Sequence, residues 1–318
     1  MNPAAPPSSS AAVLFSVVIP AHNPIPAYLA RTLAGLRTQT LPMEQWELIV
    51  VDNASKVPLA TSVDLTWHPR GRVIREERLG LTPARLAGFA AAIGEVVVLV
   101  DDDNVLAPDF LAQALAIRRE HPQLGAWSGN VVLEFAPDAV PPPPSWQSNL
   151  TERHVTADVI STDRRDHDST PWGAGLCVRR EVCAAYAAEL ASNPLRRQLD
   201  LQGQMLLYGG DTDIAYVACA AGFSKGVFAR LTLQHLIPAR RCETAYLMRS
   251  MEGHAYSSVM HEFILSGTVD ANFTSRVWRA KLWLRRLFLP HVERVEAICQ
   301  ARGIAQAVRD IRRMQASL

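Results

Sequence analysis

The sequence has no surplus of charge of either sign. Its 32 lysine and arginine residues nearly balance 31 aspartate and glutamate residues, so the formal net charge is +1 over 318 residues. Proteins that bind nucleic acid through its phosphates carry a strong positive field, and this balance therefore predicts no nucleic-acid partner. Hydrophobic residues make up 48% of the chain, enough for the packed core of an ordinary globular domain.

Cysteine is scarce, and its spacing excludes the common cysteine-based sites. The five cysteines are Cys177, Cys183, Cys219, Cys242 and Cys299, and no two of them form a CxxC pair. An odd and scattered set makes a poor disulfide framework. We therefore expect reduced thiols, and with them a cytoplasmic protein.

Long apolar runs are absent too. No stretch of about 18 apolar residues occurs, so no membrane-spanning helix is expected. The first residues, 1–13, are rich in alanine, proline and serine and lack the basic start of a secretory leader. We expect a disordered tail there.

Glycine is missing where two classes of nucleotide enzyme need it. The first apolar strand is followed by PAHNPIP at positions 20–26. A nucleotidyltransferase needs a glycine-rich triphosphate loop at this point, and a dinucleotide dehydrogenase needs GxGxxG. Both classes are therefore disfavoured.

What the first half does contain is an alternation of strands and helices. Apolar, β-branched runs predict strands, and helical spacing of apolar residues predicts helices between them. The expected strands are 15–20, 46–51, 72–76 and 95–100, and the expected helices are 26–38, 82–93 and 108–119. This alternation is typical of an α/β fold with a mostly parallel sheet covered by helices on both faces. Ligands bind outside the carboxyl ends of such strands, where polar residues follow at 20–23, 52–53 and 101–104.

The second half is less regular. Five prolines between 136 and 146 predict a loop or a subdomain boundary, and the polar segment 148–170 predicts a mobile loop. The elements expected after it are a strand at 176–178, helices at 181–190 and 214–221, and a strand at 226–233, followed by helices. We accordingly expect a catalytic domain over 14–241, with a nucleotide-binding half at 14–135, an acceptor half at 136–241, and a helical extension at 242–318.

The strongest local signal is the acidic run Asp101–Asp103, followed by Asn104. Three adjacent carboxylates at the end of a buried strand repel one another unless a cation or hydrogen-bond donors offset their charge. Mg²⁺ and Mn²⁺ prefer such oxygen ligands and also bind diphosphate oxygens. In an extended chain Asp101 and Asp103 point the same way, so they could serve one ligand while Asp102 faces elsewhere. The competing interpretation is a solvated acidic turn or the cap of the next helix.

Five other polar residues each allow two interpretations. Asp52 could accept a hydrogen bond from a base or ribose, but the run Asp-Asn-Ala-Ser also favours a turn. Arg85 could bind phosphate through its forked guanidinium, or it could lie on a helix surface. Asp211 and Asp213 begin a predicted helix, where capping explains one of them and a general base for an acceptor hydroxyl explains the pair. His235, just after a strand, could be a metal ligand or a structural residue.

Taken together, these segments resemble inverting glycosyltransferases of family two, which have the GT-A fold. The ordered set is VVIPAHN, IVVDNAS, LGLTPARLAG, VVLVDDDN, WGAGLCVRR, GGDTDIA and QHLIPARR. It covers residues 15–241 of the chain. Two positions depart from the family's pattern. Pro24 and Gly210 stand where members often have glutamate, and the second departure keeps Asp213 as an alternative to Asp211.

The resemblance implies a role for each matching residue. The nucleoside pocket and donor site would be formed by Pro20, His22, Asn23, Asp52, Arg85, Asp101 and Asp102. Asp103 would hold Mn²⁺ or Mg²⁺ on the diphosphate, with His235 as a further metal ligand. The pocket for sugar and acceptor would be lined by Trp172, Gly173, Ala174 and Gly175. Asp211 would be the catalytic base, a role that Asp213 could share.

A basic amphipathic stretch lies at 277–289, where tryptophan, leucine and phenylalanine alternate with arginine and lysine. Such a helix could lie on the anionic inner face of a membrane, which would suit a lipid-linked acceptor. It could equally pack on the catalytic domain, or on a second subunit of a homodimer.

The sequence therefore predicts a metal-assisted, inverting glycosyltransferase in bacterial glycan or glycoconjugate synthesis. Its donor would be a nucleotide-diphospho-sugar, with UDP-sugars favoured, and its acceptor a glycan, a lipid-linked sugar or a small molecule. The alternative is a non-catalytic protein that binds sugar nucleotides or glycans, because a fold does not by itself determine a function.

Overall fold

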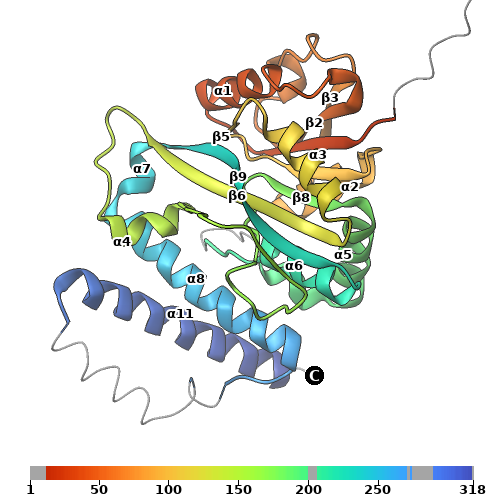
Figure 1. Cartoon of the computed structure of the whole chain (residues 1–318). Coiled ribbons are helices and arrows are strands. Elements are labelled where there is room, and N and C mark those ends of the chain that lie inside the picture. The colour runs from red at the N-terminus through yellow and green to blue at the C-terminus, as the bar shows by residue number, and fades with distance from the viewer. Residues whose placement is uncertain (1–11, 200–205, 271–272, 274–288, 317–318) are drawn as a thin grey trace, which may run out of the picture.

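A computed structural model describes residues 12–199, 206–270, 273 and 289–316. In this part of the chain nine strands form one sheet, in the order β3-β2-β1-β4-β8-β6-β9-β5, and β7 pairs with β9. The strands are β1 (Phe15–Ala21), β2 (Trp46–Asn53), β3 (Gly71–Glu76), β4 (Val96–Leu99), β5 (Asn104–Leu106), β6 (Leu124–Phe135), β7 (Val159–Ser161), β8 (Leu176–Arg179) and β9 (Ser224–Ile237). Figure 1 shows this sheet with helices packed around it.

The helices alternate with the strands in the first half and gather at the end of the chain in the second. The α-helices are α1 (Pro26–Arg37), α2 (Leu81–Ala91), α3 (Phe110–Glu120), α4 (Pro144–Gln147), α5 (Arg180–Ser192), α6 (Gly210–Ala220), α7 (Ala239–Cys242), α8 (Thr244–Ser266) and α11 (His291–Ala316). Short 3₁₀ turns are η1 (Met43–Gln45), η2 (Leu59–Thr61), η3 (Ser148–Leu150) and η4 (Pro194–Leu199).

The first half of the sheet is parallel, as the sequence predicts. Strands β3, β2, β1 and β4 lie side by side in parallel register. Every residue of β1 and β2 is buried, which is the pattern of strands covered on both faces. The expected strands and helices of this half are confirmed, with ends shifted by at most two residues.

The second half of the sheet is mixed. β8 runs antiparallel to both β4 and β6, β6 runs parallel to β9, and β5 and β7 run antiparallel to β9. The mostly parallel sheet of the prediction is therefore confined to its first four strands. The direction changes because the chain enters β8 from the long excursion after β6, not from a crossover helix that would return it in the same sense.

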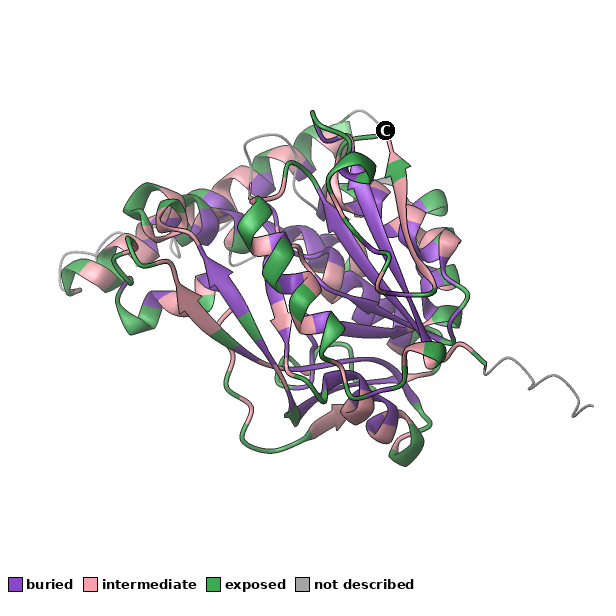
Figure 2. Cartoon of the chain, turned by 90° about the horizontal axis from the view of Figure 1, so that it is seen from above, coloured by how far each residue is buried: buried purple, intermediate pink, exposed green. Residues whose placement is uncertain are grey.

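Helices cover both faces of the sheet, so alternate strand residues enter two separate cores. Val17 packs with Leu36 of α1 and Phe110 of α3. Its neighbour Val18 packs in the opposite cluster with residues of α2, α5 and α6, among them Tyr186. Figure 2 shows the strands buried between helices whose outer faces are exposed. This three-layer arrangement confirms the predicted α/β class.

The segment 148–170 departs from the prediction of a mobile loop. It contains η3 and the strand β7, and Arg153 pairs with Val131 of β6. The guanidinium of Arg153 donates to the carbonyl oxygens of Thr170 at 2.6 Å and Asp168 at 2.9 Å. Lys225 of β9 is fully buried and also donates to this segment, at Thr170. The segment is therefore tied to the sheet through Val131 and Lys225, by contacts that its polar composition does not reveal.

The end of the described chain is helical, as expected. Helices α8 and α11 lie side by side (Figure 1), and a Cβ atom at Gly303 of α11 would come within 2.2 Å of the Glu252 carbonyl oxygen. Trp146, Leu247 and Met251 share a buried cluster, which joins α8 to the second half of the sheet through Ile237. Within the described ranges, no helix combines the length and the apolar character needed to cross a bilayer. The predicted basic helix at 277–289 lies outside the described residues except for Leu289.

Candidate active site

A cavity of about 390 Å³ lies at the carboxyl ends of β1 and β4, and we call it the acidic cavity. The predicted site residues in its wall are Pro20, Arg85, Asp101, Asp102, Asp103, Gly173, Ala174, Asp211 and His235. They come from β1, from α2, from the turn after β4, from the segment before β8, and from α6 and β9. The fold thus brings together, at the expected edge of the sheet, residues that are far apart in sequence.

A larger groove of about 660 Å³ lies elsewhere, between α1 and η2. Its wall is mostly apolar and includes Leu29, Leu33 and Trp67, and Asn23 is the one predicted site residue that it touches. Its only carboxylate is that of Asp64. We place the candidate chemistry in the acidic cavity, because the titratable groups converge there.

The acidic run forms a turn after β4. Asn104 N–H donates to the Asp101 carbonyl at 3.0 Å, and Leu236 N–H of β9 donates to the Asp103 carbonyl at 2.9 Å. All three aspartates line the acidic cavity, whereas strand alternation predicted that Asp102 would face elsewhere. That prediction fails because the extended strand ends at Leu99, before the acidic run begins.

Burial and mutual repulsion act on these carboxylates in the directions expected of a crowded acidic site. Burial, followed by the charge of Asp103, raises the pKa of Asp101. The same two causes, with Asp101 added, raise the pKa of Asp102 to about 7. Burial would also raise the pKa of Asp103, but His235 and Arg241 oppose it and hold that pKa below its ordinary value. The cluster therefore favours one buried anion at Asp103.

Two side chains meet around that anion. The Asp103 Oδ2 atom lies 3.1 Å from Nη1 of Arg241 and 3.5 Å from Nε2 of His235. The same Arg241 Nη1 lies 2.9 Å from His235 Nε2. The guanidinium thus bridges the carboxylate and the imidazole, and it supplies the positive charge that the acidic run requires.

The tautomer of His235 follows from its other contact. Its Nδ1 atom lies 2.9 Å from the carbonyl oxygen of Leu150, an acceptor, so Nδ1 carries a proton. The other ring nitrogen, Nε2, faces Asp103 and Arg241. A metal-binding histidine is commonly oriented in this way, with its second nitrogen donating to a backbone carbonyl.

The donor set suits a divalent ion that shares its coordination with phosphate oxygens. Among the described residues no group of three or more His, Cys, Asp or Glu side chains is arranged to hold a metal ion. Asp103 and His235 offer two ligand atoms 3.5 Å apart. Mg²⁺ and related ions are typically held by one or two protein ligands together with substrate phosphates. Arg241 occupies the edge that faces both ligands, so it would have to move for an ion to enter.

Asp211 lies in the first turn of α6 and faces the acidic cavity. Gly173 N–H donates to its Oδ2 at 2.6 Å, and Thr212 N–H donates to its Oδ1 at 2.9 Å. A Cβ atom at position 173 would come within 3.1 Å of Arg85 Nη2 and 3.2 Å of Asp211 Oδ2. The glycine therefore allows the guanidinium, the backbone and the carboxylate to meet at one point.

Arg85 is held over the same edge by the close packing of α2 on β1. A Cβ atom at Gly88 would lie 2.3 Å from Val18 Cγ1, so the helix rests directly on the strand. Arg85, one turn earlier, is 5% exposed and lines the acidic cavity. A buried guanidinium beside carboxylates is well suited to bind phosphate when substrate enters.

Asp213 faces the other side of α6. Its side chain is fully buried and forms an ion pair with Arg196, and its Oδ1 lies 4.0 Å from Nε2 of His261. It does not line the acidic cavity. Of the two carboxylates that the sequence offers as a base, only Asp211 is placed to meet a ligand there.

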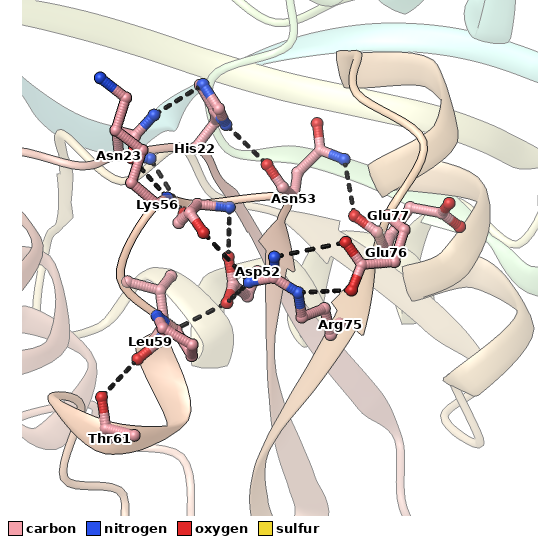
Figure 3. A network of polar contacts seen from close by, with 12 residues as sticks. His22, Asn23, Asp52, Asn53, Lys56, Leu59, Thr61, Arg75, Glu76 and Glu77 are labelled. Atoms are coloured by element: carbon pink, nitrogen blue, oxygen red, sulfur yellow. Dashed lines mark hydrogen bonds and ion pairs between the residues drawn. The ribbon is translucent and has the colours of Figure 1, made fainter.

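Asp52 lies outside the acidic cavity and organises the turn that follows β2 (Figure 3). Its carboxylate is 1% exposed and accepts from Ser55 N–H and Leu59 N–H, both at 3.0 Å, and from Arg75 Nη1 at 2.8 Å. Burial raises its pKa, but these donors outweigh burial, and the pKa is lowered. These contacts favour the turn interpretation of this residue.

His22 and Asn23 join the same network, and Figure 3 shows them directed toward the loop that follows β2. His22 Nδ1 lies 2.6 Å from the carbonyl oxygen of Asn53, and Asn23 Nδ2 lies 2.8 Å from His22 Nε2. Asn23 has a φ of 46°, in the left-handed region, and its Oδ1 accepts from Lys56 N–H at 2.9 Å. These residues shape the rim beside Pro20.

Trp172 and Gly175 also lie outside the acidic cavity. Trp172 N–H donates to Ser128 Oγ at 3.1 Å, and the Arg153 guanidinium lies 4.7 Å from the centre of its ring. Gly175 has a φ of 67°, and a Cβ atom there would lie 2.8 Å from Leu233 Cδ2. Both residues serve the turn that presents Gly173 and Ala174.

Several residues of the acidic cavity were not singled out from the sequence. They are Leu81, Asn149, Leu150, Thr151, Leu206, Leu207, Tyr208, Gly209, Arg240, Arg241 and Tyr246. Arg241 is the most informative, because it binds the carboxylate and the imidazole that the sequence did identify. The adjacent arginines of the QHLIPARR motif were the available signal: two cations just after His235.

Comparisons with known proteins show which family and which folds the chain resembles. Residues 16–168 match the model of the family described as Glycosyl transferase family 2. An N-acetylglucosaminyltransferase of Rhizobium meliloti (strain 1021) is 23% identical over 217 residues, which cover 65% of this chain and 47% of that protein. The chain spans half or less of the length of the first curated relatives that it matches.

Two solved structures resemble the fold. GalNAc-T7 with UDP, GalNAc and Mn²⁺ aligns with a TM-score of 0.53 and 17% identity, over 79% of this chain and 48% of that one. TarS of S. aureus aligns with a TM-score of 0.51 and 16% identity, over 93% of this chain and 55% of that one. At these identities the likeness establishes the fold. Residues 16–168 are therefore similar to glycosyl transferase family 2, and the chain shares the fold of these two solved structures.

Proposed function

We propose that the chain transfers a sugar from a nucleotide-diphospho-sugar to an acceptor hydroxyl, with inversion at the anomeric carbon. The observation that carries this proposal is the placement of Asp211 and the Asp103–His235 pair in one cavity. Asp211 can receive a proton, and the Asp103–His235 pair can hold a metal ion beside the diphosphate. A UDP-sugar is favoured as the donor, because GalNAc-T7, which shares the fold, is described with UDP and Mn²⁺.

The diphosphate would bind where the cations converge. Arg85, Arg240 and Arg241 line the acidic cavity, and the guanidinium fork suits phosphate oxygens. Asp103 and His235 would hold Mn²⁺ or Mg²⁺. That ion, when bound, neutralises charge on the leaving diphosphate. Arg241 would turn from Asp103 toward the phosphates, so its positive charge stays in the cavity.

Asp211 would act as the general base. Each of its oxygens already accepts one backbone N–H, and each keeps a lone pair for a further contact. The acceptor hydroxyl gives its proton to this carboxylate as its oxygen forms the new bond to the anomeric carbon. The bond from that carbon to the diphosphate oxygen breaks with its electron pair, so the configuration inverts without a covalent enzyme intermediate.

The proposed division of the chain follows this scheme. Residues 14–135 would bind the nucleotide, with Pro20 at the pocket and His22, Asn23 and Asp52 forming its framework. Residues 136–241 would bind the acceptor and carry the base. The extension at 242–318 would support the second half. The predicted contact of 277–289 with a membrane stays a prediction, which cosedimentation with anionic liposomes would test.

A non-catalytic sugar-nucleotide or glycan-binding protein is the second candidate. A binding protein needs complementarity to its ligand but no base beside the reacting carbon. Asp211 lines the same cavity as Asp103, and this favours the enzyme. A carboxylate repels a diphosphate and so weakens its binding, which a binding protein would avoid. In an enzyme the same carboxylate can act as the general base.

Calorimetric titration of UDP, GDP and dTDP, each with and without Mn²⁺, tests the donor site. We expect one nucleotide, UDP, to bind only with Mn²⁺, and binding to be lost in Asp103→Ala. Asp109→Ala is the matched control, because Asp109 caps α3 and does not line the acidic cavity. If UDP bound equally strongly with and without Mn²⁺, the proposed role of the metal ion in donor binding would be wrong. Absence of binding for all three nucleotides would overturn the donor site.

A further inference from the structure

A second cavity, of about 620 Å³, lies beside the acidic cavity, and we call it the aromatic cavity. Its wall is formed by α6, α8, the loop around 165–167 and the segment that precedes α6. It carries the rings of Tyr208, Tyr216, His254 and His261. Its volume falls in the range of pockets that bury small organic ligands.

The two cavities adjoin at Tyr208, which lines both. Asp211 lines the acidic cavity, and its neighbour Thr212 lines the aromatic one. The ring of Tyr208 stacks on His254 with a centroid distance of 4.0 Å and an interplanar angle of 10°. Tyr208, three residues before the candidate base, thus carries a stacked ring pair to the place where the two cavities adjoin.

The position of Tyr208 is held by close contacts with α8. Tyr208 N–H donates to Ser257 Oγ at 3.0 Å, and Ser250 Oγ donates to the Tyr208 hydroxyl at 3.2 Å. A Cβ atom at Gly253 would lie 1.7 Å from the carbonyl oxygen of Leu206. Only a glycine permits this approach, so the segment that carries Tyr208 is fitted to the helix.

The described wall of the aromatic cavity carries more carboxylates than arginines. Arg165 forms an ion pair with Glu262 at 3.1 Å, and the remaining carboxylate of the wall is that of Asp270. Burial lowers the pKa of His261 to about 4, so that ring is neutral at physiological pH. The described wall therefore offers rings and hydrogen-bonding groups, and its arginine is already paired with a carboxylate, which disfavours a phosphate ligand.

We infer that the aromatic cavity binds an uncharged sugar residue of the acceptor, whose hydroxyl reaches Asp211 past the Tyr208–His254 pair. The inference rests on the proposed glycosyl transfer and names the acceptor's chemical class. A sugar ring presents C–H groups on its faces and hydroxyls at its edge. The tyrosine and histidine rings match the faces, and Thr212 and Ser258 match the edge. A pyrophosphate-linked carrier would lie outside this cavity.

Filling the cavity from an exposed position tests the inference with little risk to folding. Ser258 is exposed on α8 and lines the aromatic cavity but not the acidic one. Ser258→Trp places an indole there, and Ala245→Trp places one at an exposed α8 position that lines neither cavity. A second variant, His254→Ala, removes the ring that stacks on Tyr208 without adding volume.

The measurement is binding of the labelled full chain, with UDP and Mn²⁺, to an array of neutral and phosphorylated oligosaccharides. We expect the wild type and Ala245→Trp to bind neutral oligosaccharides, and Ser258→Trp and His254→Ala to bind them at least tenfold more weakly. Equal binding by Ser258→Trp would overturn the site. Binding of the wild type to phosphorylated oligosaccharides alone, or to none, would overturn the chemical class.

Titration of UDP and Mn²⁺ into the same variants separates this inference from the proposed function. Unchanged UDP affinity in Ser258→Trp, together with weaker glycan binding, places the acceptor apart from the donor. Loss of UDP affinity in Ser258→Trp and not in Ala245→Trp would show that the two cavities form one site, which contradicts the inference. Failure of the wild type to bind any nucleotide would count against the donor site, whatever the array shows.

Discussion

The acidic and aromatic cavities meet at Tyr208 but differ in the chemistry of their walls. The acidic cavity gathers the guanidiniums of Arg85, Arg240 and Arg241 around the carboxylates of Asp101–Asp103 and Asp211. The aromatic cavity gathers tyrosine, phenylalanine and histidine rings around one paired arginine. Dense opposite charges suit a diphosphate and a metal ion, whereas rings beside a single paired arginine suit an uncharged sugar. Under the proposed function, this difference would keep the charged leaving group and the neutral nucleophile in adjoining compartments.

The largest expected effect is the loss of transfer in Asp211→Asn. The amide cannot accept the acceptor's proton, so we expect kcat to fall by roughly 10²- to 10⁴-fold, the usual contribution of a general base. Affinity for UDP with Mn²⁺ should change little, which a calorimetric titration would check. Asp109→Asn, at the start of α3, is the matched control and should transfer sugar normally. A kcat within twofold of the wild-type value would show that Asp211 is not the general base.

A smaller effect is expected when the cation beside Asp103 is removed. Arg241→Met keeps an extended apolar side chain but deletes the guanidinium that contacts Asp103 and His235. Hydrogen bonds to charged groups contribute about 1.5–3 kcal/mol, so affinity for UDP should fall roughly 10- to 150-fold. Calorimetry measures this loss directly.

Arg230→Met is the control for that experiment, because Arg230 pairs with Glu120 on the surface, away from both cavities. UDP affinity that survives unchanged in Arg241→Met would mean that the arginine only balances Asp103. If Arg241→Met weakened the binding of neutral glycans and left UDP affinity intact, Arg241 would belong to the acceptor site. That result would contradict its assignment to the diphosphate of the donor.

The smallest effect concerns acid stability on the aromatic side. The pKa of His261 is lowered from 6.5 to about 4, chiefly by burial, so between these pH values the unfolded chain binds a proton that the folded chain does not. The free energy of unfolding is therefore unaffected above pH 6.5 and falls as the pH drops toward 4, by at most about 3 kcal/mol. His261→Gln should lose less stability over this window.

Thermal unfolding from pH 7 to pH 4.5 would measure that slope. His68 is also buried with a pKa lowered to about 4, mainly by desolvation, so His261→Gln should keep part of the acid loss. His154→Gln is the control, because that side chain is 69% exposed. An identical pH dependence in His261→Gln and the wild type would show that folding does not lower the pKa of this ring, and the aromatic cavity would then gain a positive charge as the pH falls below 6.5.

The parallel half of the sheet was predictable because its strands are buried on both faces. Strands covered on both faces appear as continuous apolar runs, and β1 and β2 are buried along their whole length. β6 has no such signature. Its first residues are buried and its last ones are partly exposed, and the sequence LGAWSGNVVLEF is neither a continuous apolar run nor an alternation. β5 and β7, with three residues each, are too short to show a period.

The candidate site was predictable to a similar degree. Asp101, Asp103 and His235 belong to motifs, and all three line the acidic cavity. Arg241 and Tyr208 were not identified, because each owes its role to a partner distant in sequence. The Arg241 guanidinium acquires its role from Asp103, and the Tyr208 ring acquires its role from His254. Neither the Arg241–Asp103 pair nor the Tyr208–His254 pair can be predicted from the residues next to it in sequence.

The local sequence by itself determined the parallel strands and the acidic run at their edge, because burial on both faces demands a recognisable composition. The tertiary structure alone decided how the carboxylates of α6 are used. Asp211 and Asp213 are two residues apart, so they point to nearly opposite sides of one helix. Gly173 packs against one side and Arg196 against the other, and these long-range contacts leave Asp211 in the cavity and Asp213 in the core.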